Sequence, residues 1–313
     1  MSELHIAGRR IADDEPCYMV AEIGSNHGGS VKTACLMIVA AATAGASAVK
    51  LQKRHVPSLY TPAMLHQPYE NENSFGKTYG EHRLALEFGG KQFRACQAAA
   101  EVFKIPLFAT AFDEKSADFL MDVCVPAIKI HSGGLTDLPL LKHVAAFQVP
   151  MILSTGGADE QDIDRAIQTV TTYHTRLAVL HCTAAYPVLD YTQLNLRCIL
   201  ALRHRYPDLV VGYSGHDVGI AMSLVAYAFG ARIIEKHFTL NRASKGTDHS
   251  FSLEPVGLKK LCRDLERAHV ALGDGVKRIY ETEFGPLSKM RRWFIEGKWQ
   301  IGTAAEQEPK VHA

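Results

Sequence analysis

Short apolar segments rich in β-branched residues recur along the chain between longer amphipathic stretches. Segments of the first kind predict β-strands, and the periodic Ala- and Leu-rich stretches predict α-helices. Eight strands are predicted, over residues 18–24, 47–54, 105–113, 127–133, 149–156, 177–183, 209–216 and 232–240. The helical stretches include residues 31–44, 92–103, 137–147, 159–174, 194–206 and 220–229, and a further helix, residues 255–272, follows the last strand. Eight such units in a chain of this length predict an α/β fold, the (β/α)8 TIM barrel.

A doubly wound open sheet would give a similar alternation. Such a sheet usually carries a Gly-x-Gly-x-x-Gly turn directly after its first strand. Residues 24–29 (GSNHGG) follow the first predicted strand, but the spacing of their glycines does not match that motif. Because an open sheet also seldom needs eight regular units, the barrel is the preferred interpretation and the open sheet is the alternative.

Two segments depart from the alternation. Residues 55–90 follow the second predicted strand without a strand pattern of their own. Long loops after barrel strands usually cover the active site, so this segment is a candidate lid. The alternation of strand and helix patterns also fades after about residue 275. This predicts a single barrel domain over residues 1–275, followed by a short tail over residues 276–313 that forms no separate domain. A basic and aromatic run in the tail, residues 289–294 (KMRRWF), could pack on a partner subunit or on the barrel's own surface.

Composition narrows the function classes. The chain has 313 residues, of which 47% are hydrophobic and 21% charged, and its net charge of +1 offers no basic surface for nucleic acid or an anionic membrane. The seven cysteines stand singly, so neither a disulfide framework nor a zinc ribbon is indicated. The N-terminus lacks the apolar stretch of a signal peptide, and no apolar run is long enough to span a membrane. These features predict a cytoplasmic protein with a small ligand.

Polar residues gather near the C-terminal ends of the predicted strands. Side chains two residues apart share one face of a strand, and this parity predicts which of them point into the barrel. The predicted inward sets are Val20, Glu22 and Gly24; Lys50 and Gln52; Phe108, Thr110 and Phe112; Lys129 and His131; Ile152 and Ser154; His181 and Thr183; Ser214 and His216; and Glu235 and His237. Because TIM-barrel active sites lie at this end of the strands, the polar residues are expected to surround one cavity. The alternative for each is a buried hydrogen-bond network that only holds the barrel mouth together.

Two lysines and several hydroxyl groups predict an anion site. Lys50 and Lys129 are expected to point into the same cavity, and Ser132, Ser154 and Ser214 lie beside Gly-rich turns whose N–H groups are available. A phosphate or carboxylate would explain how two buried lysines are tolerated, because without a partner each would be desolvated at a cost.

Two histidines predict a metal site. His216 and His237 end consecutive strands and face inward, which suits a metal bound by two imidazoles with open positions for water and substrate. The alternative is that both are hydrogen-bonding residues. The carboxylates best placed for acid–base work or hydroxyl recognition are Glu22, Glu235 and Asp248. Glu235 could instead pair with one of the lysines.

The ordered motifs resemble the sialic acid (N-acetylneuraminate) synthase family of phosphoenolpyruvate-dependent enzymes over residues 16–275. The resembling stretches are residues 21–29 (AEIGSNHGG), 48–52 (AVKLQ), 109–113 (ATAFD), 128–130 (IKI), 152–156 (ILSTG), 180–183 (LHCT), 186–187 (YP), 212–216 (GYSGH), 235–239 (EKHFT), 245–249 (KGTDH) and 252–255 (SLEP). Their number and order make chance similarity an inadequate explanation.

The resemblance implies a site and a reaction. His216 and His237 would hold Mn²⁺ or Mg²⁺, and phosphoenolpyruvate would lie among Lys50, Thr110, Lys129, Ser132, Ser154, Tyr186 and Ser214. The acceptor sugar would lie near Glu22, Gln52, Phe112 and Asp248, with Glu22, Lys129 and the two histidines as the catalytic set. The metal would polarise the open-chain aldehyde, C3 of phosphoenolpyruvate would attack it, and water would add at C2 before phosphate leaves by C–O cleavage. A homodimer is also implied.

The chain departs from the family pattern on the acceptor side. Gly134 stands where the family has a carboxylate, His131 introduces an imidazole nearby, and Ala184 replaces an asparagine. The C-terminal antifreeze-like domain, which in the family supplies an Arg across the dimer, is not found in the sequence. These changes predict an aldose other than N-acetylmannosamine, either smaller or without the acetamido group. His131 either replaces the lost contact or is a packing residue.

Two rival functions remain. A synthase of the 3-deoxy-octulosonate or 3-deoxy-heptulosonate phosphate type would need an extra basic cluster for a sugar phosphate, and Lys53, Arg54 and His55 are the candidates. Such residues at the start of a loop are ordinarily solvated. A catalytically inactive barrel that only binds a sugar is the other alternative, although it would have no need to keep the lysines and the histidine pair.

Overall fold

The computed structural model describes residues 2–295 and 297–301. The chain divides between Val270 and Ala271 into two compact units, which are described separately. The first unit is a closed barrel of eight parallel strands, as the sequence predicted. Its strands are β3 (Tyr18–Gly24), β4 (Ala48–Lys53), β5 (Leu107–Ala111), β6 (Ile128–Ile130), β7 (Met151–Ser154), β8 (Leu177–Cys182), β9 (Val210–Gly215) and β10 (Ile233–His237). Pairing of β10 with both β9 and β3 closes the barrel.

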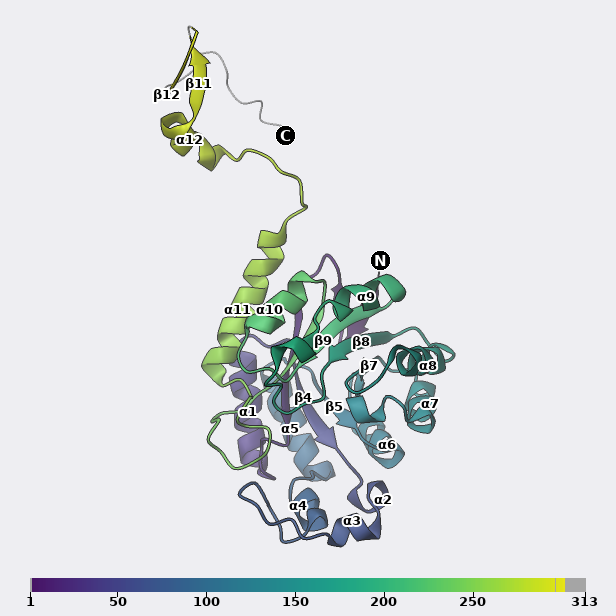
Figure 1. Cartoon of the computed structure of the whole chain (residues 1–313). Helices are drawn as coiled ribbons and strands as arrows, with labels where there is room; N and C mark the ends of the chain where they lie inside the picture. The colour runs from purple at the N-terminus through teal and green to yellow at the C-terminus, as the bar shows by residue number, and fades with distance from the viewer. Residues whose placement is uncertain (1, 296, 302–313) are drawn as a thin grey trace. The chain divides into compact units, whose positions relative to one another are not determined.

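Helices alternate with these strands and cover the outside of the barrel (Figure 1). They are α1 (Val31–Thr43), α5 (Gly90–Val102), α6 (Glu114–Asp122), α7 (Leu138–Ala146), α8 (Glu160–Thr171), α9 (Cys198–Arg205), α10 (Ala221–Ala228) and α11 (Pro255–Leu272). The helical pattern of residues 114–122 had not been singled out, although Asp113 caps α6 by accepting a hydrogen bond from the Ser116 N–H.

The barrel interior is packed so closely that one strand position accepts only glycine. A Cβ atom at Gly212 in β9 would lie 2.3 Å from Leu180 Cδ2 and 2.5 Å from the Ile233 carbonyl oxygen. The second neighbour is backbone and cannot move without disturbing β10.

We therefore expect Gly212→Ala to destabilise the fold by about 1–3 kcal/mol, the usual cost of overpacking a core. Chemical denaturation would measure the change. Gly257→Ala is the matched control, because a Cβ there meets Leu253 Cδ2 only at 3.5 Å. Equal unfolding midpoints for the two variants would contradict the prediction.

A hairpin precedes the barrel and had not been predicted. Strands β1 (Glu3–Ile6) and β2 (Arg9–Ala12) pair antiparallel, and Leu4, Ile6 and Ile11 join the hydrophobic core. After β2, the Asp13 carboxylate accepts hydrogen bonds from Arg203 and from Arg232, the residue before β10. The hairpin thus lies at the N-terminal end of the barrel strands, opposite the end that carries the predicted site.

The segment over residues 55–90 is not a plain loop. It contains α2 (Val56–Leu59), α3 (Pro62–His66) and α4 (Tyr79–Ala85). A capping box between Thr78 and Glu81 starts α4, a local signal that was present in the sequence. Phe75, His82, Arg83 and Leu86 from this segment line a cavity at the C-terminal ends of the barrel strands, so the segment forms part of its wall.

The second unit contains η3 (Glu281–Glu283), α12 (Phe284–Met290) and an antiparallel pair of strands, β11 (Arg292–Ile295) and β12 (Lys298–Ile301). The basic and aromatic run therefore spans the end of a helix and the start of a strand. The expectation that residues 276–313 form no separate domain stays a prediction. Within the described residues, no helix combines the length and the apolar character needed to cross a bilayer.

Candidate active site

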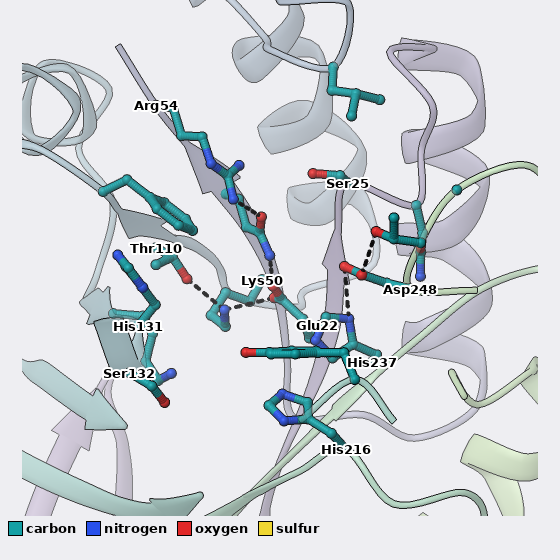
Figure 2. A pocket seen from close by; sticks show the side chains of 18 of the residues that line it. Glu22, Ser25, Lys50, Arg54, Thr110, His131, Ser132, His216, His237 and Asp248 are labelled. Atoms are coloured by element: carbon teal, nitrogen blue, oxygen red, sulfur yellow. Dashed lines mark hydrogen bonds and ion pairs between the residues drawn. The ribbon is translucent and has the colours of Figure 1, made fainter. Parts of the chain in front are cut away.

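One cavity of about 470 Å³ opens at the C-terminal ends of the barrel strands (Figure 2). Every residue that the sequence assigned to a site lines it: Glu22, Lys50, Gln52, Thr110, Phe112, Lys129, His131, Ser132, Ser154, Tyr186, Ser214, His216, His237 and Asp248. The barrel brings these residues together because parallel strands all end at the same rim.

Two buried lysines and two buried carboxylates form the floor of the cavity. Lys50 Nζ lies 2.8 Å from Glu22 Oε2 and 3.7 Å from Glu235 Oε1, and Lys129 Nζ lies 3.4 Å from the same Glu235 oxygen. These four side chains are at most 6% exposed. Because the carboxylates balance the charge of the lysines, a bound anion is not needed to explain their burial, and the alternative that Glu235 pairs with the lysines is confirmed.

Hydroxyl groups hold the lysines in place. Lys50 Nζ donates to Thr110 Oγ1 at 2.6 Å, and Lys129 Nζ donates to Ser154 Oγ at 2.6 Å. Ser214 Oγ in turn donates to Glu235 Oε1 at 3.1 Å. Both ammonium groups are therefore fixed in position before any ligand enters.

The two carboxylates of the floor differ in proton affinity. Burial raises the pKa of Glu22, and the charge of Lys50 opposes the rise only in part. Burial acts on Glu235 in the same sense, but Lys129 and Lys50 outweigh it and bring the pKa of Glu235 to about 2. Glu235 is thus the fixed negative charge, and Glu22 is the carboxyl better suited to exchange a proton.

The two histidines face each other across the end of β9 and β10. Their ring centroids lie 5.4 Å apart, and His216 Nδ1 donates to the Thr183 carbonyl oxygen at 2.9 Å, which leaves its Nε2 as a free lone pair. His237 Nδ1 is buried without a hydrogen-bond partner in the described structure, because Asp248 Oδ2 lies 3.7 Å away. Burial lowers the pKa of both rings, that of His216 to about 3. Both are therefore neutral imidazoles, the form that binds metals.

The two histidines supply suitable nitrogen donors for a metal ion, but the number of protein ligands around them is small. Two neutral imidazoles with uncommitted nitrogens suit a divalent ion that keeps open positions. The part of the chain that the structure describes contains no group of three or more His, Cys, Asp or Glu side chains arranged to hold a metal. An ion bound here would thus depend on two protein ligands.

An aromatic stack forms the side wall of the cavity. The His131 and Phe112 rings lie parallel at 4.0 Å, and the Arg54 guanidinium covers the Phe112 ring at 3.6 Å. A Cβ atom at Gly134 would lie 3.4 Å from His131 Nε2, so the imidazole borders the space that a larger residue at 134 would enter. Burial lowers the pKa of His131 to about 3, and the ring is neutral.

One predicted inward set was wrong. His181 and Thr183 in and after β8 do not line this cavity; they line a neighbouring one together with Ala184, while Cys182 faces the main cavity. His181 Nε2 hydrogen-bonds to the Leu194 carbonyl oxygen at 2.7 Å. The prediction had assigned the polar His181, rather than the apolar Cys182, to the inner face of β8. His181 instead hydrogen-bonds to a carbonyl group of the segment that follows this strand.

Several lining residues had been missed. Those not named in advance as site residues are Ser25, Asn26, Phe75, His82, Arg83, Leu86, Cys182, Gly246 and Thr247. Arg54 also lines the cavity; the sequence named it only as a candidate for the rival sugar-phosphate function, although it continues the inward series of Lys50 and Gln52. The residues of the 55–90 segment carry no strand parity and gave no such signal.

The parallel strands of the closed barrel end in cations, hydroxyl groups and neutral imidazoles that surround one cavity. This combination of fold and site is that of a (β/α)8-barrel enzyme. Residues 37–277 match the NeuB family, and the chain belongs to this family. NeuB-family synthases condense phosphoenolpyruvate with a sugar.

Individual relatives agree with this assignment. The chain is 42% identical over 245 residues to the N-acetylneuraminate-9-phosphate synthase of Drosophila melanogaster, a match of 78% of this chain and 66% of that protein. It is 38% identical over 283 residues to the human protein of the same name, covering 90% of this chain and 79% of that one. The N-acetylneuraminic acid synthetase of Leptospira borgpetersenii, solved in complex with citrate, superimposes with a TM-score of 0.80 at 32% identity over 91% of this chain and 95% of that one.

Proposed function

We propose that this chain condenses phosphoenolpyruvate with an open-chain aldose to give a 3-deoxy-2-keto sugar acid and inorganic phosphate. The observation that carries the proposal is that two lysines held by hydroxyls and two neutral histidines meet in one cavity at the strand ends. Cations suit the phosphate and carboxylate of phosphoenolpyruvate, and the imidazoles suit the carbonyl end of the aldose.

Phosphoenolpyruvate is assigned to the floor of the cavity. Each lysine ammonium has three N–H donors, and Lys129 directs them to Ser154 and Glu235 only, so one remains for a ligand. The assigned residues are Lys50, Thr110, Lys129, Ser132, Ser154, Tyr186 and Ser214. Since Glu22 and Glu235 already balance the two lysines, the affinity for phosphoenolpyruvate has to come from oriented hydrogen bonds as much as from net charge.

The aldose is assigned to the space between Glu22, Gln52, Phe112, His131 and Asp248. Gln52 Nε2 donates to Glu22 Oε1 at 2.8 Å, which orients that carboxyl toward the cavity. Glu22, with its raised pKa, would give or take the proton of an acceptor oxygen. Phe112 and His131 present flat faces against which a sugar carbon skeleton can pack.

His216 and His237 would hold a divalent ion such as Mn²⁺ or Mg²⁺. When bound, that ion supplies Lewis-acid polarisation of the aldehyde oxygen. In the reaction, C3 of phosphoenolpyruvate bonds to the aldehyde carbon, water adds at C2, and the C–O bond to phosphate breaks. Lys129 and Lys50 stay in reach of the phosphate oxygens and stabilise the charge that the leaving group takes with it.

The proposal is tested by mixing the full-length protein with phosphoenolpyruvate, Mn²⁺ or Mg²⁺ and single aldoses. We expect at least one aldose to release stoichiometric phosphate and to give a product whose mass corresponds to the aldose plus pyruvate. If the complete set of aldoses and aldose phosphates releases phosphate no faster than phosphoenolpyruvate alone, the proposal fails.

The acceptor is further proposed to be an aldose other than N-acetylmannosamine. Gly134 offers no side chain to an acetamido group, and the His131 ring occupies the adjoining space. Ala184 lines the neighbouring cavity, so its small size does not bear on this point. We expect kcat/KM for N-acetylmannosamine to lie below that for at least one acceptor without the acetamido group, measured by phosphate release. A clear preference for N-acetylmannosamine would contradict this expectation.

A further inference from the structure

Asp248 reaches the cavity on a loop, residues 238–254, that joins β10 to α11. Its Oδ2 lies 3.7 Å from His237 Nδ1, and Figure 2 shows the two side chains next to each other. On the C-terminal side the loop is fixed, because Ser252 Oγ donates to the Asp248 carbonyl oxygen at 2.5 Å and accepts from Asn26 Nδ2 at 3.0 Å. The position of the Asp248 carboxylate therefore depends also on what holds the residues that precede it.

The preceding residues are held by the segment over residues 55–90, which comes from a different strand. Gly246 N–H donates to Asn73 Oδ1 at 2.9 Å, two residues before Asp248. A second contact lies beside this hydrogen bond, since Lys245 Nζ is 5.1 Å from the centroid of the Phe75 ring. Both partners of the hydrogen bond are half-buried. The segment and the loop thus meet at the cavity that both of them line.

The backbone between the hydrogen bond and Asp248 is closely packed. Gly246 has a φ of +142°, which side chains rarely tolerate, and a Cβ atom there would lie 2.8 Å from His249 Cδ2. His249 is buried in turn, and its Nδ1 hydrogen-bonds with Thr239 Oγ1 at 2.7 Å. Because only one residue separates Gly246 from Asp248, a displacement of the Gly246 N–H is passed on to the carboxylate.

The segment that carries Asn73 is anchored to the barrel at its two ends. Glu87 Oε2 accepts from Lys53 Nζ and from the Arg54 N–H, both at 3.0 Å, and the His55 N–H donates to Asp113 Oδ2 at 2.8 Å. The Lys53 and Arg54 side chains are 13% and 6% exposed, so the solvated loop entry expected from the sequence is not observed. With both ends fixed, the segment can support a contact at its middle.

We propose that Asn73 is a positioning residue for the acceptor side of the site, because it holds the Gly246 N–H and thereby fixes the Asp248 carboxylate beside His237. The inference rests on the proposed function, which assigns Asp248 to the aldose. Asn73 does not itself line the cavity, so it acts through the loop and not on the substrate. Phosphoenolpyruvate is assigned to the floor of the cavity, away from this contact, and its binding should not depend on Asn73.

Kinetics of three variants of the full-length protein test the proposal, with the aldose that releases phosphate fastest as acceptor. Asn73→Leu removes the hydrogen-bond acceptor, Asn73→Asp keeps one, and Glu72→Leu places the same leucine at the exposed neighbouring position as the control. With the aldose limiting, we expect Asn73→Leu to lower kcat/KM by about three- to tenfold, the effect of one hydrogen bond. With phosphoenolpyruvate limiting, kcat/KM should change by less than about twofold. Asn73→Asp and the control should stay within about twofold of the native protein.

Amide hydrogen exchange, followed by mass spectrometry, reads the contact without any turnover. The peptide that contains Gly246 and Thr247 should exchange faster in Asn73→Leu than in the native protein, because its N–H group loses an acceptor. Asn73→Asp and Glu72→Leu should leave its exchange unchanged. A peptide that covers β5 should exchange alike in all four proteins, which shows that the fold is intact.

The outcomes separate the inference from the function on which it rests. Native exchange of the Gly246 peptide in Asn73→Leu, or faster exchange with unchanged kcat/KM for the aldose, overturns the role of Asn73 and leaves the synthase standing. Equal losses with either substrate limiting, or an Asn73→Asp variant that behaves like Asn73→Leu, also contradict the inference. If the native protein turns over no acceptor, the synthase itself is overturned, and the positioning role is overturned with it.

Discussion

His237→Ala is expected to abolish metal-dependent phosphate release, with a loss in kcat/KM of about a thousandfold or more. The ring is buried at the end of β10, and its Nδ1 has no hydrogen-bond partner in the described structure. Lewis-acid stabilisation of a developing oxyanion is worth several kcal/mol, and each 1.36 kcal/mol corresponds to a factor of ten in rate. With only two protein ligands proposed, loss of one leaves a single imidazole, so His216→Ala should have an effect of similar size.

The measurement combines phosphate release with a direct readout of the metal. Paramagnetic resonance of free Mn²⁺ should show tight binding by the native protein and weak binding by both histidine variants. His143→Ala is the control, because this histidine lies on the surface and pairs with Asp118. If His237→Ala turns over at the native rate with the same Mn²⁺ dependence, the histidine pair has no metal role.

The largest effect on stability is expected from Lys236→Met. Lys236 and Asp217 are 1% and 0% exposed, and Lys236 Nζ lies 3.0 Å from Asp217 Oδ1, which also accepts from the Tyr213 hydroxyl at 2.9 Å. Removal of the ammonium leaves a buried carboxylate without its counter-charge, a change that costs about 3–5 kcal/mol. Burial lowers the pKa of Lys236 and the Asp217 charge opposes this, so the two residues depend on each other.

Denaturant unfolding of Lys236→Met, Asp217→Asn and the double variant would measure this dependence. We expect the double variant to be less destabilised than the sum of the single variants, because it contains no unpaired buried charge. Lys260→Met, at an exposed position of α11, is the matched control and should change stability by less than about 0.5 kcal/mol. A loss below about 1 kcal/mol in Lys236→Met would show that the pair contributes little.

The ion pair also bears on the proposed metal site. Asp217 follows His216 in the chain, and Lys236 precedes His237. The pair therefore ties together the two strand ends from which the histidines project. Asp217 and Lys236 can thus help to position His216 and His237, although neither of them lines the cavity.

Prediction from sequence succeeded where the signal was periodic and local. The eight strands lie within the predicted ranges, because each is a short apolar run between turn residues. Strand parity placed Lys50, Lys129 and His237 in the cavity, because a polar residue in a buried strand has few other places to point. The hairpin before the barrel escaped notice, since its two strands of four residues each are too short for a clear pattern.

Prediction failed where contacts join distant segments. The charge balance of the floor depends on Glu22, Lys50, Lys129 and Glu235, which come from four different strands, and the sequence offered the pairing of Glu235 with a lysine only as an alternative. The direction in which the His181 side chain points depends on its hydrogen bond to the Leu194 carbonyl oxygen. The spacing of residues along the chain indicates which side chains share a face, but it does not give the distances between residues of different segments.

The sequence by itself thus determined the barrel, the order of its strands and most of the residues at its rim, because hydrophobic periodicity and strand parity are properties of neighbouring residues. The tertiary structure alone decided which charges are paired and which are not. It showed that Lys50 and Lys129 are balanced by buried carboxylates and that Arg54 is buried. The physical reason is that the energy of a buried charge depends on distances to groups remote in sequence, and only the folded chain sets those distances.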